Sequence, residues 1–256
     1  EFLHTKFKVP VIYNFRYADI NKGGNGAPLM PFLDWLLFKN YDTNIMTLNI
    51  GGISNISYVK QNCELNEVVG FDTGPGMSLI DEFVLLKWGK KYDKNGLLAS
   101  KGKINHDLLS KLLSHKYISR QPPKSTGRED FGNRYLIEVI KKYNDLKPVD
   151  ILRTLVKFSS LSIKLNLEAF ILKNYSIDQL LISGGGINHP VLIEDIKKDL
   201  DIPIINMIDY GVESKFKESF LMTVLGYSRI RKIKSNMPSV TGASDEVVLG
   251  DIYESK

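Results

Sequence analysis

The chain has 256 residues, enough to bury one large core or two modest ones. Its 43% hydrophobic and 25% charged residues are typical of a soluble globular protein, and no apolar run approaches the roughly 18 residues that span a bilayer. The net charge is +5, but the lysines are scattered and form no basic stripe, so we expect neither nucleic acid nor a membrane as a partner.

The single cysteine, Cys63, has no partner for an internal disulfide, and no Cys/His cluster has the spacing of a zinc site. No signal peptide is visible. A lone cysteine fits a reducing compartment, so we predict a cytoplasmic protein without a directly bound metal.

The predicted elements alternate between strands and helices, which favours an α/β fold. The first residues read as the end of a helix that runs into a strand at 9–15, and we expect a further portion of the protein to precede them. The other predicted strands are 45–50, 53–59, 66–72, 179–183 and 203–207. The predicted helices are 30–38, 76–88, 104–114, 130–145, 148–173, 189–200 and 212–232, and the predicted loops are 21–28, 119–132 and the tail after 235.

A Gly-Gly turn joins the strands at 45–50 and 53–59. Gly51 and Gly52 leave backbone N–H groups exposed with no Cβ in the way, and such a concavity can hold phosphate oxygens. Asn49 and Asn55 flank the turn and can hydrogen-bond a phosphate. The plainer interpretation is an ordinary hairpin turn.

Three glycines follow the strand at 179–183, and Asn188 stands near the start of the next helix. Gly184, Gly185 and Gly186 would allow a flat ring or a phosphate close to the backbone. The spacing is not that of a dinucleotide fingerprint. A turn that needs tight packing remains the alternative.

The stretch GFDTGPGMSLIDE places Asp72 at the end of a predicted strand, where ligands collect in open α/β sheets. Gly74 and Gly76 permit unusual dihedral angles, and Pro75 stiffens the turn between them. Asp72 either caps this turn or is held there as a base. We expect Asp81 and Glu82 to lie at a solvated edge.

Other charged residues give weaker signals. Arg16 and Asp19 can hydrogen-bond a sugar or pair with each other, and Arg128 lies in a loop that could cover a substrate. Glu218 has apolar neighbours on a predicted helix, and a partly buried carboxylate needs a partner. The histidines are isolated, and we assign them no catalytic role.

Seven blocks in one order closely resemble the anhydro-N-acetylmuramic acid kinases, of the superfamily of acetate and sugar kinases, heat-shock chaperones and actin. They are FRYADINKGGNGAPLMP, LNIGGISNISYV, GFDTGPGMSLID, YDKNG, PPKSTGREDFG, ISGGGINHP and MPSVTGA, and they cover essentially the whole chain. The chain departs from the family pattern at Met77, where the family usually carries Asn. The family's first phosphate loop is not found, so we expect an N-terminally truncated fragment that alone is impaired as an enzyme.

The resemblance implies an α/β fold of the actin-like ATPase (ribonuclease H-like) kind, with a mixed sheet flanked by helices and ATP between two lobes. Residues 1–44 would be the remainder of the N-terminal lobe and the interlobe segment, and residues 45–256 the C-terminal lobe. Asp72 matches the family's catalytic aspartate, and Glu218 is a candidate supporting carboxylate. The implied nucleotide-binding residues are Asn49, Gly51, Gly52, Gly184, Gly185, Gly186 and Asn188. The implied sugar-binding residues are Arg16, Asp19, Thr73, Gly74 and Arg128.

The implied activity is that of an ATP-dependent kinase that hydrolyses the 1,6-anhydro bond of anhydro-N-acetylmuramic acid while phosphorylating O6, a step of peptidoglycan recycling. Mg²⁺ would be held by water and ATP rather than by the protein, and the family suggests a homodimer. The alternatives are a levoglucosan-type kinase, a non-catalytic nucleotide-binding clamp of the chaperone or actin sort, and a catalytically impaired fragment.

Overall fold

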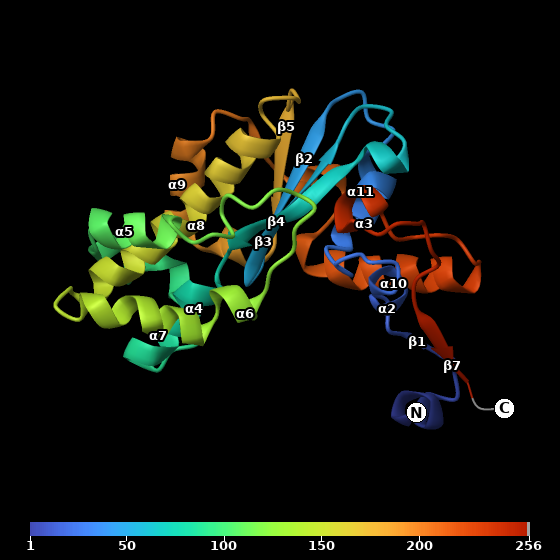
Figure 1. The fold of residues 1–256 in the computed structure, drawn as a ribbon, viewed down its shortest axis with the longest axis horizontal. Coiled ribbons are helices and arrows are strands. Elements are labelled where there is room, and N and C mark those ends of the chain that lie inside the picture. Colours follow the sequence, from blue (N-terminus) through green and yellow to red (C-terminus); the bar gives the residue numbers. More distant parts are fainter. Residues whose placement is uncertain (255–256) are drawn as a thin grey trace.

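A five-stranded mixed sheet forms the centre of the structure, a computed structural model that describes residues 1–254 (Figure 1). Its strand order is β4-β3-β2-β5-β6. The antiparallel part contains β2 (Ile45–Ile50), β3 (Ile53–Val59) and β4 (Val69–Pro75), and the parallel part adds β5 (Gln179–Ser183) and β6 (Ile204–Asn206). The α/β fold class, with a mixed sheet flanked by helices, is confirmed.

The strands form where apolar residues alternate between two cores. In β5, Leu180 and Ile182 pack into the larger core, whereas Leu181 between them packs into the smaller core on the opposite face. Both strands of the Gly-Gly hairpin, β2 and β3, have the bounds that the sequence predicts.

Strand β4 continues three residues beyond its predicted end, so Asp72 lies inside the strand rather than at its terminus. The prediction was wrong because β3 extends far enough to pair Ile53 with Pro75. A register shift between Ser54 and Asn55 places Asn55 opposite Asp72. Such bulges re-aim side chains and are frequent beside active sites.

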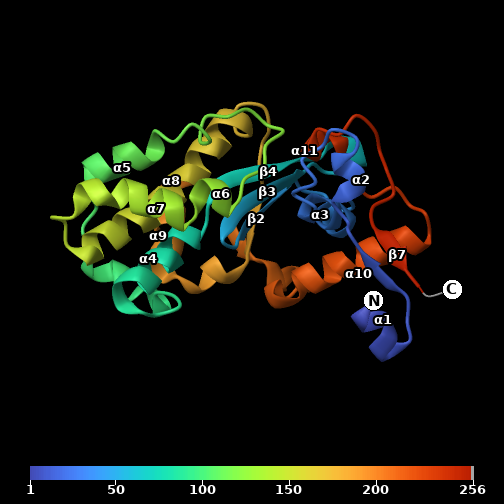
Figure 2. The same cartoon turned by 60° about the horizontal axis from the view of Figure 1, so that its bottom comes forward.

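One face of the sheet carries the larger core and the longest helix, α8 (Pro148–Phe170), which begins with a proline in its first turn as predicted. Figures 1 and 2 show the other helices of this face around α8. They are α4 (Ser78–Trp88), α5 (His106–Leu113), α6 (Arg128–Phe131), α7 (Asn133–Ile140) and α9 (Pro190–Asp199). The predicted helix 130–145 and loop 119–132 were wrong in detail, because Gly132 has an extended backbone (φ −117°) that separates α6 from α7.

The opposite face carries the smaller core and the helices α3 (Met30–Phe38), α10 (Lys217–Ile230) and α11 (Pro238–Thr241). The two helices that precede α3 in the chain are α1 (Phe2–Phe7) and α2 (Tyr17–Ile20). Strand β1 (Val11–Tyr13) pairs with β7 (Asp251–Tyr253), so the two ends of the chain lie together in Figure 2. The tail was predicted to be loop-like with a short apolar end. It contains α11 and β7 instead. The division of the chain at residue 44 stays a prediction.

Short 3₁₀ turns connect these elements, at Leu65–Glu67, Lys94–Gly96, Ala99–Lys101, Lys141–Tyr143, Gly185–Asn188, Met207–Tyr210 and Ser214–Phe216. Helix α10 begins five residues later than predicted, after the left-handed Gly211 and the last of these turns. No helix within residues 1–254 is long and apolar enough to cross a membrane.

A buried ion pair joins α3 to α10. The Nζ atom of Lys217 lies 2.7 Å from Oδ1 of Asp34, and both side chains are at most 2% exposed. The hydroxyl groups of Thr47 and Ser57 donate to the other carboxylate oxygen, at 2.7 and 2.6 Å. Asp34 thereby links α3, α10, β2 and β3 at one point, and removing either charge would leave the other unpaired in the core.

We expect Lys217→Met to lower the free energy of unfolding by about 3–5 kcal/mol, because it strands the Asp34 carboxylate. Urea unfolding followed by circular dichroism measures this loss. Lys164→Met is the control: Lys164 pairs with the half-exposed Glu168 on the surface of α8, and its loss should change stability by less than about 1 kcal/mol. Equal effects of the two substitutions would contradict a special role for the buried pair.

Candidate functional site

Asp72 faces a cavity of about 780 Å³ between the sheet and α10. Segments far apart in the sequence line it, including residues 14–16, 27–30 and 125–126. Its charged and amide lining residues are Asn14, Arg16, Asn49, Asn55, Asp72 and Glu218. The cavity therefore gathers polar groups from both sides of the molecule around one carboxylate.

The carboxylate of Asp72 is held from one side. Its Oδ2 atom accepts hydrogen bonds from the Ser125 hydroxyl and the Thr126 peptide N–H, both at 2.9 Å. The peptide N–H of Asp72 donates to the Lys124 carbonyl, and its carbonyl accepts from the Tyr117 hydroxyl. No group among residues 1–254 donates to Oδ1, which leaves that oxygen available to a ligand or a water.

Burial raises the pKa of Asp72 to about 6, since only 5% of the residue is exposed. The Thr126 N–H, the Ser125 hydroxyl and the positive charges of Arg16 and Lys124 oppose this effect, in that order. Asp72 is therefore ionised at neutral pH, yet it is more basic than an ordinary aspartate. A pKa near the working pH is what general base catalysis requires.

Two further residues that the sequence singled out lie on the same cavity. Arg16 stands just before α2 and is exposed. Glu218, in the first turn of α10, is also exposed, so the prediction of a partly buried carboxylate was wrong. The helix buries its neighbour Lys217 instead, which turns Glu218 toward the cavity.

Asp19 does not line the cavity. It is fully buried, and its Oδ1 atom accepts from Asn236 Nδ2 and Thr241 Oγ1, at 2.9 and 2.7 Å. Its Oδ2 atom accepts from the Gly26 N–H at 2.8 Å. Asp19 thus ties the Gly-rich loop 21–28 to the tail, and this use of both oxygens favours a structural role.

Three other residues of the predicted sugar side lie off the cavity lining. Thr73 is fully buried, with its hydroxyl 2.7 Å from that of Ser54, and a Cβ at Gly74 would collide with Ser162. The Arg128 side chain is 75% exposed and reaches Glu82 at 3.4 Å. Sugar contacts by Thr73, Gly74 and Arg128 stay predictions.

A second cavity, of about 570 Å³, brings two of the glycine turns together. Gly51 and Gly52 line it from the β2–β3 turn, and Gly185 and Asn188 line it from the turn after β5. They meet because β2 and β5 are parallel neighbours, so both strands end at the same edge of the sheet. Met77, which differs from the family pattern, lines this cavity and not that of Asp72.

The glycines of these two turns serve two purposes: some are required for packing, and others leave the backbone accessible to a ligand. A Cβ at Gly184 or Gly186 would collide with Ile50, and Gly184 has a φ of +87°, so these two glycines are required by the fold. A Cβ at Gly52 would meet nothing closer than 3.9 Å, and one at Gly185 would meet nothing within 4 Å. Gly52 and Gly185 therefore leave open space where a ligand can approach the backbone.

A third hollow, of about 310 Å³, adjoins both cavities. It shares Asn49 and Glu218 with the Asp72 cavity, and Gly185 and Asn188 with the glycine cavity. Asn49 Oδ1 accepts a hydrogen bond from Ser183, which ties the two parallel strands together at this point. The three cavities thus share lining residues in series, and together they form the row from Asp72 to the glycine turns that is called the groove below.

Asp81 was wrongly predicted to lie at a solvated edge. It is half-buried and lines the glycine cavity, and burial, reinforced by Asp93 and opposed by Arg128, raises its pKa to about 6. Its distance of one helical turn from the Gly-Pro-Gly segment was the available signal. Glu82 is only 15% exposed at its side chain.

Asp93 and His189 form the buried wall of the glycine cavity and were also missed. The Asp93 carboxylate accepts from the peptide N–H groups of Leu98 and Ala99. His189 accepts from the Leu192 N–H at Nδ1, so its Nε2 carries the hydrogen that faces Asp93 at 3.5 Å. Burial lowers the pKa of His189, which keeps the ring neutral.

The sequence pattern of the family described as anhydro-N-acetylmuramic acid kinase matches residues 1–255. A protein of that name from Clostridioides difficile (strain 630) is 43% identical over 243 residues, covering 94% of this chain and 63% of the relative. Another, from Francisella tularensis subsp. novicida (strain U112), is 39% identical over 242 residues, covering 94% and 64%. The chain thus spans slightly less than two thirds of the length of these relatives.

Among solved structures, the chain is similar to a ligand-bound xylulose kinase from Lactobacillus acidophilus. The TM-score is 0.46 at 13% identity, over 86% of this chain and 46% of that chain. It is also similar to an activator of 2-hydroxyisocaproyl-CoA dehydratase from Clostridium difficile with bound ADPNP, with a TM-score of 0.43 at 10% identity over 82% and 69% of the chains.

We expect Ser125→Ala to raise the pKa of Asp72 above its value of about 6 by about one unit, because the hydroxyl bonds the ionised carboxylate. Carbon-13 NMR of the labelled aspartate carboxyl groups, assigned by comparison with Asp72→Asn, measures the titration. Ser119→Ala removes a hydroxyl of the same loop that bonds the Lys116 carbonyl instead of Asp72, and it should leave the titration unchanged. An unshifted Asp72 in Ser125→Ala would refute the hydrogen bond's electrostatic effect.

Proposed function

The chain belongs to the anhydro-N-acetylmuramic acid kinase family, and from this membership we propose that the protein is a kinase that opens the 1,6-anhydro bridge of anhydro-N-acetylmuramic acid while phosphorylating its O6. The product is N-acetylmuramic acid 6-phosphate, as in peptidoglycan recycling. The observation that carries the proposal is Asp72, a base with one free oxygen in a groove that continues to the glycine turns.

In the proposed reaction, Asp72 Oδ1 takes a proton from a water molecule. The hydroxyl oxygen of that water bonds to C1 of the sugar, and the C1–O6 bond of the bridge breaks. O6, released from C1, bonds to the γ-phosphorus of ATP as the bond to the β–γ bridging oxygen breaks, and ADP leaves. Mg²⁺ held by the phosphates would screen their charge. Ser125 and Thr126 occupy Oδ2, so they direct the free oxygen of Asp72 toward the cavity. A base of this kind typically contributes about 100- to 10,000-fold in rate.

The nucleotide fits the glycine end of the groove. The peptide N–H of Gly52 donates to no described group, and neither Gly52 nor Gly185 would be crowded by a Cβ. Asn49 and Asn188 add amide groups to the same groove. The family resemblance gives Mg²⁺ phosphate and water ligands, and that assignment is part of the proposal. Within residues 1–254 no cluster of three or more His, Cys, Asp or Glu side chains could hold a metal ion.

The sugar fits the Asp72 end of the groove, where Arg16 and Glu218 supply opposite charges on the lining. Arg16 is the proposed donor to the sugar's oxygen atoms, and Glu218 a second carboxylate near the reacting bond. A homodimer and a cytoplasmic location are further parts of the proposal and rest on the family resemblance and the lone cysteine.

We expect Asp72→Asn in the full-length protein to lower kcat by at least about 100-fold while ATP still binds. In the wild type, kcat/KM should fall as the pH drops below about 6, because Asp72 then gains a proton. Steady-state assays with anhydro-N-acetylmuramic acid and calorimetric titration with ATP measure both effects. Near-normal turnover in Asp72→Asn would remove Asp72 as the base.

We also expect Asp72→Asn to raise the free energy of unfolding above pH 6. The folded-state pKa of about 6 exceeds the ordinary aspartate pKa of 3.8, so the folded protein binds this proton more tightly than the unfolded chain does. Stability therefore falls as the pH rises from about 4 to about 6, and Asp72→Asn lacks that loss. Melting temperatures at pH 4 and pH 7.5 test this, and a variant less stable than the wild type at pH 7.5 would contradict it.

We expect Gly185→Ala and Gly52→Ala to weaken ATP binding by about tenfold or more, which is about 1.4 kcal/mol, because each methyl group fills space that the fold leaves open. Gly226→Ala in α10 is the matched control, since its Cβ would meet only Ile12 at 3.6 Å, away from the groove. Calorimetry gives the dissociation constants and circular dichroism checks the fold. Unchanged affinity in both variants would place the nucleotide elsewhere.

A further inference from the structure

Lys124 is a buried cation that the proposed reaction does not use. It lies in the irregular segment before α6, and none of it is exposed to solvent. No carboxylate of residues 1–254 lies within ion-pair distance of its ammonium group. Lysine is almost never fully buried without a charged partner, so this position calls for a physical reason.

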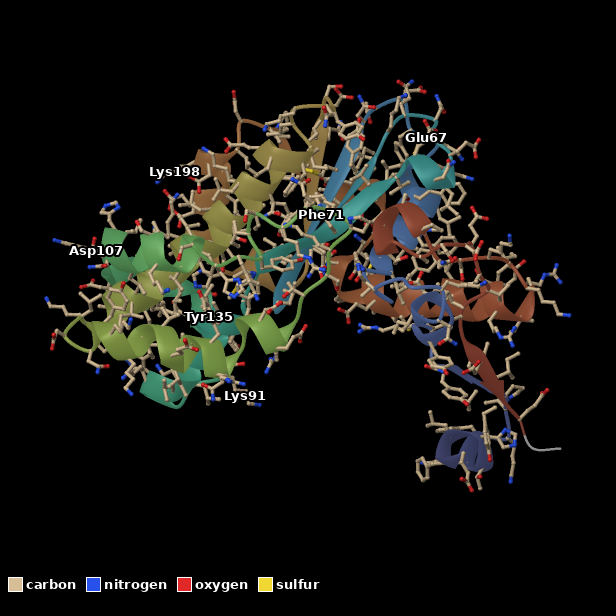
Figure 3. The ribbon with its side chains drawn as sticks, viewed as in Figure 1. Glu67, Phe71, Lys91, Asp107, Tyr135 and Lys198 are labelled. Carbon is tan, nitrogen blue, oxygen red and sulfur yellow. The ribbon has the colours of Figure 1, made fainter. Side chains whose placement is uncertain are left out.

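Neutral groups satisfy the ammonium instead. Its Nζ atom donates to Asn166 Oδ1 at 2.5 Å and to the carbonyl oxygens of Tyr117 and Ile118 at 3.3 and 3.5 Å, which uses its three hydrogens. The rings of Tyr117, Phe170 and Phe71 lie with their centres 4.8, 4.9 and 5.5 Å from the charge. Aromatic faces attract a desolvated cation, so these three rings and three oxygen atoms together stabilise the buried charge, and we call them the Lys124 box. Figure 3 labels Phe71, on β4 in the middle of the molecule.

Two of the groups around the ammonium, Tyr117 and Asn166, and the backbone of Lys124 itself also bond Asp72 or its neighbour Thr73 in β4. The Lys124 carbonyl accepts from the Asp72 N–H, and the Tyr117 hydroxyl donates to the Asp72 carbonyl at 2.8 Å. Asn166 Nδ2 donates to the Thr73 carbonyl at 3.0 Å. The residue that follows Lys124 supplies the Ser125 hydroxyl to the Asp72 carboxylate.

We propose that Lys124 is a positioning residue for Asp72: its buried ammonium group anchors residues 124–126 against β4, so that the donors of Ser125 and Thr126 meet the carboxylate, and its charge favours the ionised form. An effect of Lys124 on catalysis rests on the proposed function. An effect of Lys124 on the position and titration of Asp72 does not.

The electrostatics agree with this geometry. Burial, reinforced by Arg120 and opposed by Asp72, lowers the pKa of Lys124 to about 8, so the lysine carries its charge throughout the range in which Asp72 titrates, near pH 6. The other charged groups that face Asp72 are Arg16, whose charge lowers its pKa, and Glu218 across the cavity.

The test is Lys124→Met in the full-length protein, which keeps the length of the side chain and removes its charge and donors. We expect the Asp72 titration, followed by carbon-13 NMR of its carboxyl group, to move up by about one pH unit, and the acid limb of kcat/KM to move with it. Lys157→Met is the matched control, because Lys157 lies on α8, is 17% exposed at its side chain and pairs with Asp199. It should leave the Asp72 titration unchanged.

An Asp72 titration that stays within about 0.2 unit of the wild type in a folded Lys124→Met protein would overturn the inference. If that variant does not fold, Asn166→Ala, which removes the shortest contact of the ammonium, takes its place; an upward shift supports the inference and an unmoved titration overturns it. The titration is read without any substrate. A shifted Asp72 in a protein without kinase activity would therefore reject the proposed function and keep the role of Lys124, whereas an active kinase with an unmoved Asp72 would do the reverse.

Discussion

The candidate site depends on one electrostatic balance, that of a carboxylate kept almost dry. At 5% exposure, Asp72 loses most of its hydration, which favours the neutral acid. Two hydrogen bonds from a single loop partly replace the lost hydration and so stabilise the charged form. The resulting pKa of about 6 is a compromise between these effects, and it exists only while the loop stays in place. Buried hydroxyl groups hold the other side of the site: those of Ser162 and Ser54 donate to the carbonyl oxygens of Thr73 and Gly74 in β4, the strand that carries Asp72.

The topology of the sheet supplies the second requirement, which is a path from this carboxylate to the glycine turns. Because β2 lies between an antiparallel and a parallel neighbour, its end meets both the turn to β3 and the turn after β5. Asn49, one residue before that end, lines both the Asp72 cavity and the connecting hollow. The Asp34–Lys217 ion pair then fixes α10 against the same strands, so Glu218 stands on the groove at a position set by its buried neighbour.

The sequence predicts most of this arrangement wherever the signal is local. The hairpin 45–59, β5 and α3 have the expected bounds because alternation, apolar runs and glycines are read within a few residues. Tertiary partners decide the rest. Asp19 could not be assigned to the tail because its partner Asn236 lies 217 residues away. Helical spacing places Asp81 one turn after the Gly-Pro-Gly segment, but it does not show that Asp93, twelve residues later, lines the same cavity. Residues such as Ser125 and Thr126 belong to a recognised block, yet only the folded loop places their donors on Asp72.

Each buried charged group of this structure loses its hydration, and this loss costs stability. The smaller core holds a full ion pair, β4 holds a carboxylate with a raised pKa, and the box behind it holds a lysine with a lowered one. Apolar side chains of similar volume would often be as stable in such places or more so. For Asp34 and Lys217 the compensation is mutual and structural. For Asp72 and Lys124 it is incomplete, because neither forms an ion pair with another described residue and both pKa values move toward neutrality. Burial raises the proton affinity of Asp72 and lowers that of Lys124, and each shift costs stability at neutral pH. The raised proton affinity of Asp72 is the property that the proposed general base needs.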